Sequence, residues 1–245
     1  MRIPWINIFL FLATVVTTVV AGTMLENVDP LVEPWKLYRG LPFSLTLLTI
    51  LSVHELAHYL VSRRGRVQCS LPYFIPIPPP FSLLGTLGAF IKMKSRINDR
   101  AILIEIGLAG PLAGFCVAVM AVLIGLTQSQ VRAASPELAY ELIFGSSLLF
   151  SFLTWVVLGV SASSKEIIVL NPIAFAGWIG FFVTALNLLP AGQLDGGHII
   201  YALLGRRSRL IPRGVFVVLL GLGVLWHGWF FWAAVILVLG FRHPT

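Results

Sequence analysis

The segment His54-Glu55-Leu56-Ala57-His58 carries the side chains best suited to chemistry in this chain. On a helix, residues four apart lie on one face, so both imidazoles can hold one metal ion with Glu55 beside them. This spacing is typical of zinc metalloproteases. Because the segment lies in an apolar run, each polar side chain costs free energy unless it ligates, pairs or meets water. The alternative is a pair of buried histidines hydrogen-bonded to neighbouring helices.

A second polar stretch, from Asn187 to His198, places a carboxylate where helix-breaking residues interrupt an apolar region. Irregular backbone inside a membrane is tolerated only where it is packed in protein or lines a wet cavity. Catalytic zinc commonly takes three protein ligands and leaves a fourth position for water, so Asp195 is the natural third ligand. The alternative is that Asp195 caps a short helix over 196–204. His198 is a competing ligand candidate.

The composition indicates whether the chain folds in water or in a membrane. The 245 residues are 58% hydrophobic and 11% charged, with a mean hydropathy of +0.92, which indicates a polytopic membrane protein rather than a soluble domain. The formal net charge of +7 lies mostly in clusters that flank apolar runs, so membrane topology explains it better than nucleic-acid binding. Cys69 and Cys116 are too few for a disulfide framework or a thiolate zinc site.

The apolar runs predict an all-α fold with about six transmembrane helices. The run 213–241 is long for one helix and short for two, so we interpret it as a hairpin of two short spans. The run 143–159 is interpreted as a short re-entrant or interfacial helix, because a full span there would move the next basic cluster to the outside; a full span is the alternative. The remaining predicted spans are 6–24, 41–62, 101–126 and 173–189.

The predicted organisation has three parts. Residues 1–40 form a first span and an outer loop, residues 41–205 form the core that holds the polar motifs, and residues 206–245 form the C-terminal hairpin. Between positions 63 and 100 lie seven basic residues, which places this side in the cytoplasm and the histidines near it. These residues are Arg63, Arg64, Arg66, Lys92, Lys94, Arg96 and Arg100.

The segment 67–95 follows the second span and contains five prolines, which forbid a continuous helix. Within it, residues 85–91 have the composition of a strand. The apolar and aromatic content predicts a small membrane-associated β-hairpin rather than a floppy cytoplasmic loop. An open strand edge there could pair with an extended substrate. The predicted substrate-binding residues are Gly85, Thr86, Leu87, Gly88 and Ala89.

The two motifs HELAH and NLLPAGQLDGG together resemble those of the site-2 protease family of intramembrane zinc metalloproteases, in particular compact members without a PDZ domain. GTLGAFI and GPLAG are also similar to segments of that family, so the resemblance covers residues 41–205. It implies that His54, His58 and Asp195 bind one Zn²⁺ ion per chain and that Glu55 is the general base. It further implies that Asn187 helps to hold the substrate or the oxyanion, with an interhelical hydrogen bond as the alternative role.

We therefore predict a protease that cleaves a peptide bond in or near a transmembrane helix of a single-span membrane protein. The expected setting is a lipid bilayer, specifically a bacterial inner membrane, with the active site towards the cytoplasm and no nucleic-acid partner. One rival is a secondary transporter or metal carrier, because broken helices and intramembrane carboxylates also mark transport sites. No inverted repeat supports it. The other rival is a proteolytically silent family member that acts as a binding module, which the intact Glu55 argues against.

Overall fold

The computed structural model describes residues 4–95, 97, 99–133, 147–160, 166–192, 194–225 and 227–239. The chain divides into two compact units. Unit 1 consists of Met1–Ser52, Tyr73–Ala89 and Phe115–Phe181, and unit 2 consists of Val53–Pro72, Phe90–Gly114 and Phe182–Thr245. From the sequence alone, we divided the chain into three parts at residues 40 and 205 according to the position of the polar motifs. That division stays a prediction.

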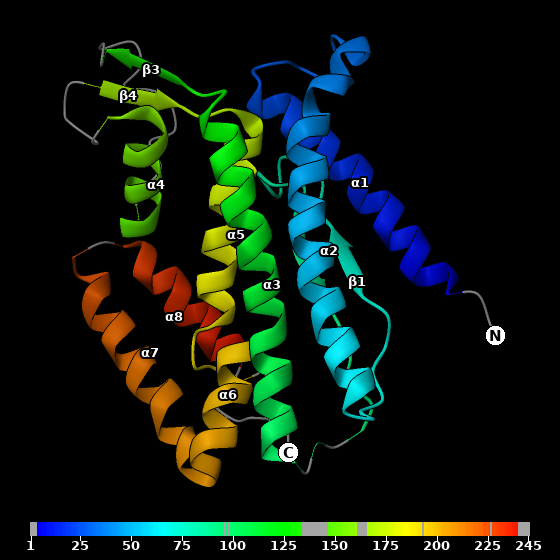
Figure 1. Cartoon of the computed structure of the whole chain (residues 1–245), viewed down its shortest axis with the longest axis vertical. Helices are drawn as coiled ribbons and strands as arrows, with labels where there is room; N and C mark the ends of the chain where they lie inside the picture. Colours follow the sequence, from blue (N-terminus) through cyan, green and yellow to red (C-terminus); the bar gives the residue numbers. More distant parts are fainter. Residues whose placement is uncertain are drawn as a thin grey trace. The chain divides into compact units, whose positions relative to one another are not determined.

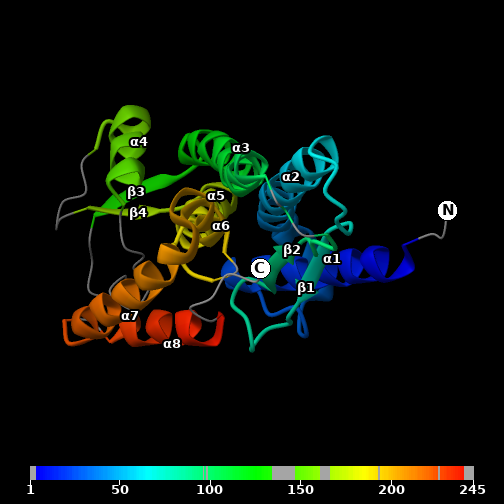
Figure 2. The ribbon, with the colours of Figure 1, turned by 90° about the horizontal axis from the view of Figure 1, so that it is seen from below.

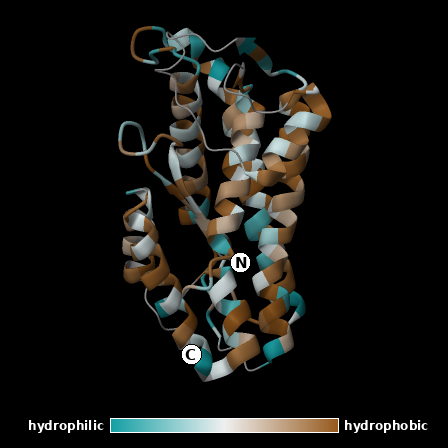
Figure 3. Cartoon of the chain, turned by 90° about the vertical axis from the view of Figure 1, so that its left-hand side faces the viewer, coloured by the Kyte–Doolittle hydropathy of each residue, from teal (hydrophilic) through white to brown (hydrophobic). Residues whose placement is uncertain are grey.

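Helices dominate both units, and hydrophobic colours predominate along them in Figure 3. Within the described residues, three helical segments are long and apolar enough to cross a membrane. They are α1 (Trp5–Leu25), the segment Pro34–Arg64 and α3 (Arg100–Leu126). The segment Pro34–Arg64 consists of the 3₁₀ helix η1 (Pro34–Gly40) and α2 (Leu41–Arg64). These helices coincide with the first three predicted spans.

The polar side chains of Thr14 and Thr18 in α1 are hydrogen-bonded. Threonine hydroxyls would be costly in an apolar helix, but Thr14 donates to the carbonyl of Leu10 at 2.7 Å and Thr18 donates to the carbonyl of Thr14 at 2.7 Å. Thr18 also shares a hydrogen bond of 2.6 Å with Ser44 of α2, which ties the two helices together inside unit 1.

Two short strands, β1 (Tyr73–Pro76) and β2 (Thr86–Phe90), form a two-stranded sheet in the segment where prolines exclude a helix. The predicted strand 85–91 therefore agrees with β2 to within one residue at each end. β1 packs against α1 in unit 1, where the rings of Phe11 and Phe74 meet edge to face at 5.0 Å. In unit 2, the flanking segments 68–70 and 92–94 pair antiparallel through a bridge between Cys69 and Met93.

The sequence did not indicate a second small sheet in unit 1. β3 (Gln130–Ala133) and β4 (Glu166–Val169) lie side by side in Figure 1. They pair antiparallel, with Gln130 opposite Val169. α4 (Leu148–Leu158) begins after Ser147, whose side chain accepts a hydrogen bond from the amide of Phe150. Its 11 residues span about 17 Å, well short of a hydrocarbon core of about 30 Å. Positions 143–146 of the predicted re-entrant segment lie outside the described residues.

The last helices all belong wholly or partly to unit 2. α5 (Pro172–Asn187) is followed by α6 (Asp195–Leu204), the 3₁₀ helix η3 (Gly205–Arg209), α7 (Leu210–Gly223) and α8 (Gly228–Leu239). α7 and α8 pack side by side (Figures 1 and 2). The structure has two helices where we predicted a hairpin of two short spans, but at 14 and 12 residues they are shorter than a hydrocarbon core requires, and the hairpin of two spans stays a prediction.

The core of unit 2 links this helical pair to the chain break before α6. Ala191 is fully buried against Leu219 of α7 and against Ala233 and Ile236 of α8. Gly196 and Gly197 allow the first turn of α6 to lie directly on the same break, because a Cβ on Gly196 would lie 2.1 Å from the carbonyl oxygen of Leu188. The Pro/Gly break is therefore a packed structure, which is the condition under which irregular backbone survives in a membrane.

Candidate metal centre

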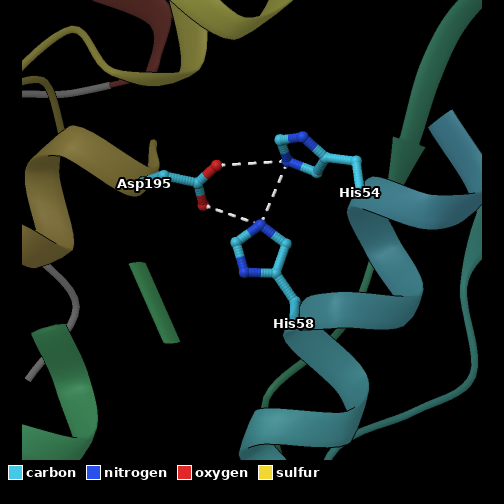
Figure 4. A group of neighbouring side chains, drawn as sticks. All are labelled: His54, His58 and Asp195. Atoms are coloured by element: carbon cyan, nitrogen blue, oxygen red, sulfur yellow. Dashed lines mark hydrogen bonds and ion pairs between the residues drawn. The ribbon is translucent and has the colours of Figure 1, made fainter. Parts of the chain in front are cut away.

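The two histidines of α2 point to the same place. His54 and His58 lie one turn apart in unit 2 and are 4% and 5% exposed. Their Nε2 atoms approach to 3.0 Å and their ring centroids lie 4.8 Å apart (Figure 4). The i, i+4 spacing thus places both imidazoles on one buried helix face, as the sequence predicted.

Asp195 meets both rings from α6. Its Oδ2 lies 3.3 Å from Nε2 of His54 and its Oδ1 lies 3.3 Å from Nε2 of His58 (Figure 4). Asp195 is the first residue of α6, whereas the cap position is Leu194, where no side chain caps the helix. The alternative role of Asp195 as a helix cap is therefore wrong. The break before α6 instead aims the carboxylate at the two imidazoles.

The three side chains suit a zinc ion. Among the described residues, they form a cluster whose possible ligand atoms all lie within 4.8 Å of one another. Zinc bonds of about 2.0–2.1 Å in a tetrahedral site separate neighbouring ligand atoms by about 3.3–3.4 Å. In this structure the two Nε2 atoms lie 3.0 Å apart, and each lies 3.3 Å from a different carboxylate oxygen of Asp195. Two histidines and one carboxylate also leave one coordination position free, as catalytic zinc requires.

A backbone carbonyl fixes the tautomer of His58. Its Nδ1 lies 2.7 Å from the carbonyl oxygen of Ile106 in α3, so Nδ1 carries the proton and donates it. The lone pair is then on Nε2, the atom that faces His54 and Asp195. Metal-binding histidines usually make such a second hydrogen bond, which orients the ring and sets its basicity.

Glycines in α3 make room for the rings. A Cβ on Gly110 would lie 2.0 Å from Nε2 of His58, and a Cβ on Gly114 would lie 3.1 Å from Nδ1 of His54. The two glycines are four residues apart, as are the two histidines. The segment GPLAG therefore packs against the side chains of His54 and His58 themselves.

Two further polar residues border the cluster. Glu55 is only 6% exposed, and its carboxylate accepts a hydrogen bond from the backbone amide of Ile91, which follows β2 directly. Asn187, the last residue of α5, places its Nδ2 3.3 Å from Nε2 of His54. The amide of Asn187 thus makes an interhelical contact and reaches a metal-binding atom at the same time.

Comparison with known proteins identifies the family. Residues 42–226 match Peptidase family M50. The chain belongs to this family. M50 is the site-2 protease family, so the family predicted from the two motifs is confirmed.

Curated relatives of this M50 member include plant proteins. It is 37% identical over 189 residues to the probable zinc metalloprotease EGY1, chloroplastic, of Arabidopsis thaliana, a match that covers 76% of this chain and 34% of that protein. It is 32% identical over 201 residues to the probable zinc metalloprotease EGY2, chloroplastic, of the same plant, covering 82% and 35%. The chain thus spans about a third of the length of these relatives. No solved structure matches it.

The remaining site predictions fall on different parts of this M50 member. Among the described residues, the metal cluster consists of His54, His58 and Asp195 and does not include His198. The predicted substrate-binding residues, Gly85 to Ala89, lie in unit 1, whereas the metal cluster lies in unit 2.

The five predicted substrate-binding residues have different surroundings. Gly85, at a φ of 78°, packs on α1, and Thr86 donates from its hydroxyl to the carbonyl of Ile75 at 2.9 Å. Leu87 is 69% exposed, and a Cβ on Gly88 would meet nothing within 4 Å. Within β2, Thr86 is therefore buried, Gly88 and Ala89 are half-buried, and Leu87 and Phe90 are exposed.

Sequence reasoning missed the backbone groups of the site. The carbonyl of Ile106 and the amide of Ile91 have no sequence signature, because any residue could supply them. The roles of Gly110 and Gly114 did have a signal: two glycines four apart in one apolar run match two histidines four apart in another. Only the contact between the runs, which the fold supplies, shows that these pairs face each other.

Proposed function

We propose that this chain is an intramembrane zinc metalloprotease that cleaves a peptide bond in or near a transmembrane helix of a single-span membrane protein. The observation that carries the proposal is the convergence of His54, His58 and Asp195 in the interior of apolar helices, with Glu55 beside them. Three ligands of this kind match a catalytic zinc site, and a glutamate next to the first histidine matches the metalloprotease motif. The names of the plant relatives agree with this chemistry.

The catalytic roles follow from the chemistry of each group. Zinc, when bound, polarises the scissile carbonyl and makes water more acidic. The Glu55 carboxylate takes a proton from the attacking water and passes it to the leaving amide nitrogen. The backbone amide of Ile91 donates a hydrogen bond to that carboxylate. The Nδ2–H of Asn187, close to Nε2 of His54, donates a hydrogen bond to the oxyanion or to the substrate backbone.

The substrate must be unwound before it can react. A helix shields its amides in i to i−4 hydrogen bonds, so a segment has to become extended to present its scissile bond. β2 offers an extended partner by strand addition, with the exposed Leu87 on it. The strand also leads without interruption to Ile91, whose amide contacts Glu55. These observations support a role of Gly85 to Ala89 in substrate binding.

The membrane arrangement forms part of the proposal. We infer that α1, α2, α3, α5, α7 and α8 cross the bilayer and that α4 is re-entrant or interfacial. The apolar composition of these helices supports this, and the shorter ones require local thinning of the bilayer. The basic residues after α2 support an active site towards the cytoplasmic side. The bacterial inner membrane stays a prediction.

The decisive experiment replaces Glu55 with Gln and measures both metal and cleavage. The Glu55→Gln protein should retain zinc by elemental analysis, because the three ligands are intact. It should lose about 10²–10⁴-fold in the cleavage rate of a single-span substrate, the usual contribution of a general base. Glu105→Gln makes the same chemical change on an exposed position of α3 and serves as the matched control. Full activity of Glu55→Gln would refute the proposal.

A chelator separates the rival functions. Cleavage in detergent that stops on zinc removal and returns with zinc supports a protease. Metal binding without cleavage, together with metal transport by reconstituted vesicles, would instead support a carrier. Metal binding with neither activity would support the silent binding module.

The strand assignment has its own test. Leu87→Pro removes a backbone amide from β2, and Leu87→Asp places a charge on its exposed face. Both changes should lower cleavage about tenfold or more while zinc content stays unchanged, as expected if the strand binds substrate by backbone pairing. Leu83→Asp, at a position 51% exposed just before the strand, is the control. Unchanged cleavage by Leu87→Pro would remove β2 from the mechanism.

A further inference from the structure

The end of α2 and the segment that follows β2 carry five exposed cations in unit 2, which we call the basic patch. The amide of Val67 donates to the carbonyl of Ser62 at 2.8 Å, which holds the chain leaving α2 against the end of the helix. The next residue, Gln68, accepts a hydrogen bond of 2.7 Å from the amide of Lys94. The basic patch consists of Arg63, Arg64, Arg66, Lys92 and Lys94.

Backbone pairing gathers these charges. Ser70 donates its amide to the carbonyl of Lys92 at 2.9 Å, and Cys69 lies opposite Met93. Because alternate residues of an extended segment share a side, Lys92 and Lys94 project together, while the half-buried Met93 faces the other way. The two lysines are therefore presented as a pair.

The basic patch has no carboxylate of its own. Within the described part of the chain, ion pairs occur between Lys36 and Glu33 and between Asp195 and the two histidines, and none involves the patch. The carboxylate of Asp99, the nearest acid along the chain, accepts a hydrogen bond from the amide of Ala101 at the start of α3. Five like charges held close together repel one another unless an external anion lies among them.

Exposed apolar residues adjoin the patch on both elements. On α2, the exposed face carries Leu56 and Leu60, which are 48% and 57% exposed, and then changes to arginine within one turn. Beside the paired segments, Leu71 follows Ser70 and Phe90 precedes Lys92. They are 40% and 47% exposed. On both elements, therefore, exposed apolar residues lie directly beside exposed cations.

We propose that the basic patch binds the headgroup of an anionic phospholipid, with the acyl chains against the neighbouring apolar residues. Only an amphiphilic anion satisfies both halves of this surface. Clusters of four to eight Lys or Arg residues immediately beyond a membrane helix attract anionic lipids, and each contributes about a factor of five in affinity. A nucleic acid or an acidic soluble protein would engage the cations but would offer no apolar surface to the exposed Leu56 and Leu60 of α2.

The test is a titration of the purified full chain in neutral detergent with dioleoyl phosphatidylglycerol or dioleoyl phosphatidylcholine, followed by native mass spectrometry. Phosphatidylglycerol should bind more tightly than phosphatidylcholine by well over about 25-fold, since five cations contribute about a factor of five each. The difference should shrink at high salt. The Lys92→Gln/Lys94→Gln pair should weaken phosphatidylglycerol binding about 25-fold and leave phosphatidylcholine binding unchanged. Lys92→Arg/Lys94→Arg should retain the selectivity.

The matched control neutralises Lys36 and Arg39, a second pair of cations that lies in unit 1 and includes a lysine already paired with Glu33. Its lipid selectivity should equal that of the wild type. If the Lys92→Gln/Lys94→Gln protein fails to fold, Arg63→Gln/Arg64→Gln tests the helix half of the patch. Equal affinity of the wild type for both lipids would overturn the proposal. So would full displacement of the lipid by equimolar glycerol phosphate, or by an acidic peptide.

Discussion

Two regions of this chain use glycine to bring helices into contact, but for different purposes. In unit 1, Gly40 lies against α1, where a Cβ would meet the carbonyl oxygen of Val19 at 2.0 Å. In unit 2, Gly110 lies against α2, where a Cβ would also meet its neighbour at 2.0 Å, but that neighbour is Nε2 of His58. In the first case glycine lets backbone meet backbone, and in the second it clears space for a metal ligand.

The difference teaches how to interpret small residues in apolar runs. Close packing is the usual meaning of such residues in membrane helices, and unit 1 conforms to it. The same sequence pattern in unit 2 has a chemical consequence, because the atom that needs the space is the one that binds metal. Substitutions should therefore have different effects in the two regions. Those at the glycine of unit 1 should lower the stability of the fold, and those at the glycine of unit 2 should chiefly lower metal affinity.

The largest effect is expected from Gly110→Ala. The new methyl group would displace the ring of His58, which the carbonyl of Ile106 holds from its other side. We expect zinc affinity to fall about 100-fold, the upper end of losses seen when the support of a ligand is removed. Thermal stability of the metal-free protein should fall less than in Gly40→Ala, because the displaced group is a side-chain ring rather than backbone. Metal titration with Co²⁺ as a spectroscopic probe measures the loss.

Gly114→Ala provides the matched control for this change. Its Cβ would lie 3.1 Å from Nδ1 of His54, a contact that a few tenths of an ångström of movement relieves. Its effect on zinc affinity should be tenfold smaller or less. Equal zinc affinities for Gly110→Ala and wild type would show that the glycine serves packing alone, and the contrast between the two regions would disappear.

The next effect is expected from Gly40→Ala in unit 1. The added methyl group collides with backbone on α1, which cannot rotate away as a side chain can. Overpacking of this kind costs about 1–3 kcal/mol, so the thermal midpoint in detergent should fall while zinc affinity per folded molecule stays unchanged. Gly221→Ala in α7, where a Cβ would meet nothing within 4 Å, is the control and should be neutral or slightly stabilising. A loss of zinc affinity in Gly40→Ala would contradict the separation.

The sequence predicted the parts of this molecule that depend on local chemistry. Hydrophobic length located α1, α2 and α3, and prolines excluded a helix over 67–95. The spacing of His54 and His58 located two members of the cluster that could hold a metal ion. The assignment of Asp195 as third ligand needed only the position of a carboxylate in a broken helix and the usual number of zinc ligands. These features are encoded by residue type, so they can be recognised before the fold is known.

The rest depends on contacts between distant segments. The pairing of β3 with β4 joins residues about 35 positions apart. The segment of β4 lacks the alternation of apolar and polar residues that would indicate a strand. The hydrogen bond from His58 to Ile106 uses a carbonyl that every residue possesses. The lengths of α7 and α8 could also not be predicted from the sequence. An apolar run shows where a helix can form, but the helix ends depend on packing against other segments.

The smallest effect is expected from a polar contact in unit 1, which should influence stability but not zinc affinity, as the glycine contact there does. Thr18→Val keeps the shape of the side chain and removes the hydrogen bond of 2.6 Å to Ser44. Such interhelical hydrogen bonds average about 0.6 kcal/mol in membrane proteins, because the separated helices also find partners. A double-mutant cycle with Ser44→Ala, followed by thermal unfolding, isolates this coupling. Zinc affinity should stay at the wild-type value in all three variants, since neither hydroxyl contacts the metal-binding side chains. A coupling above about 2 kcal/mol would exceed the range known for such bonds and would mean that this polar pair, rather than the glycines, holds α1 to α2.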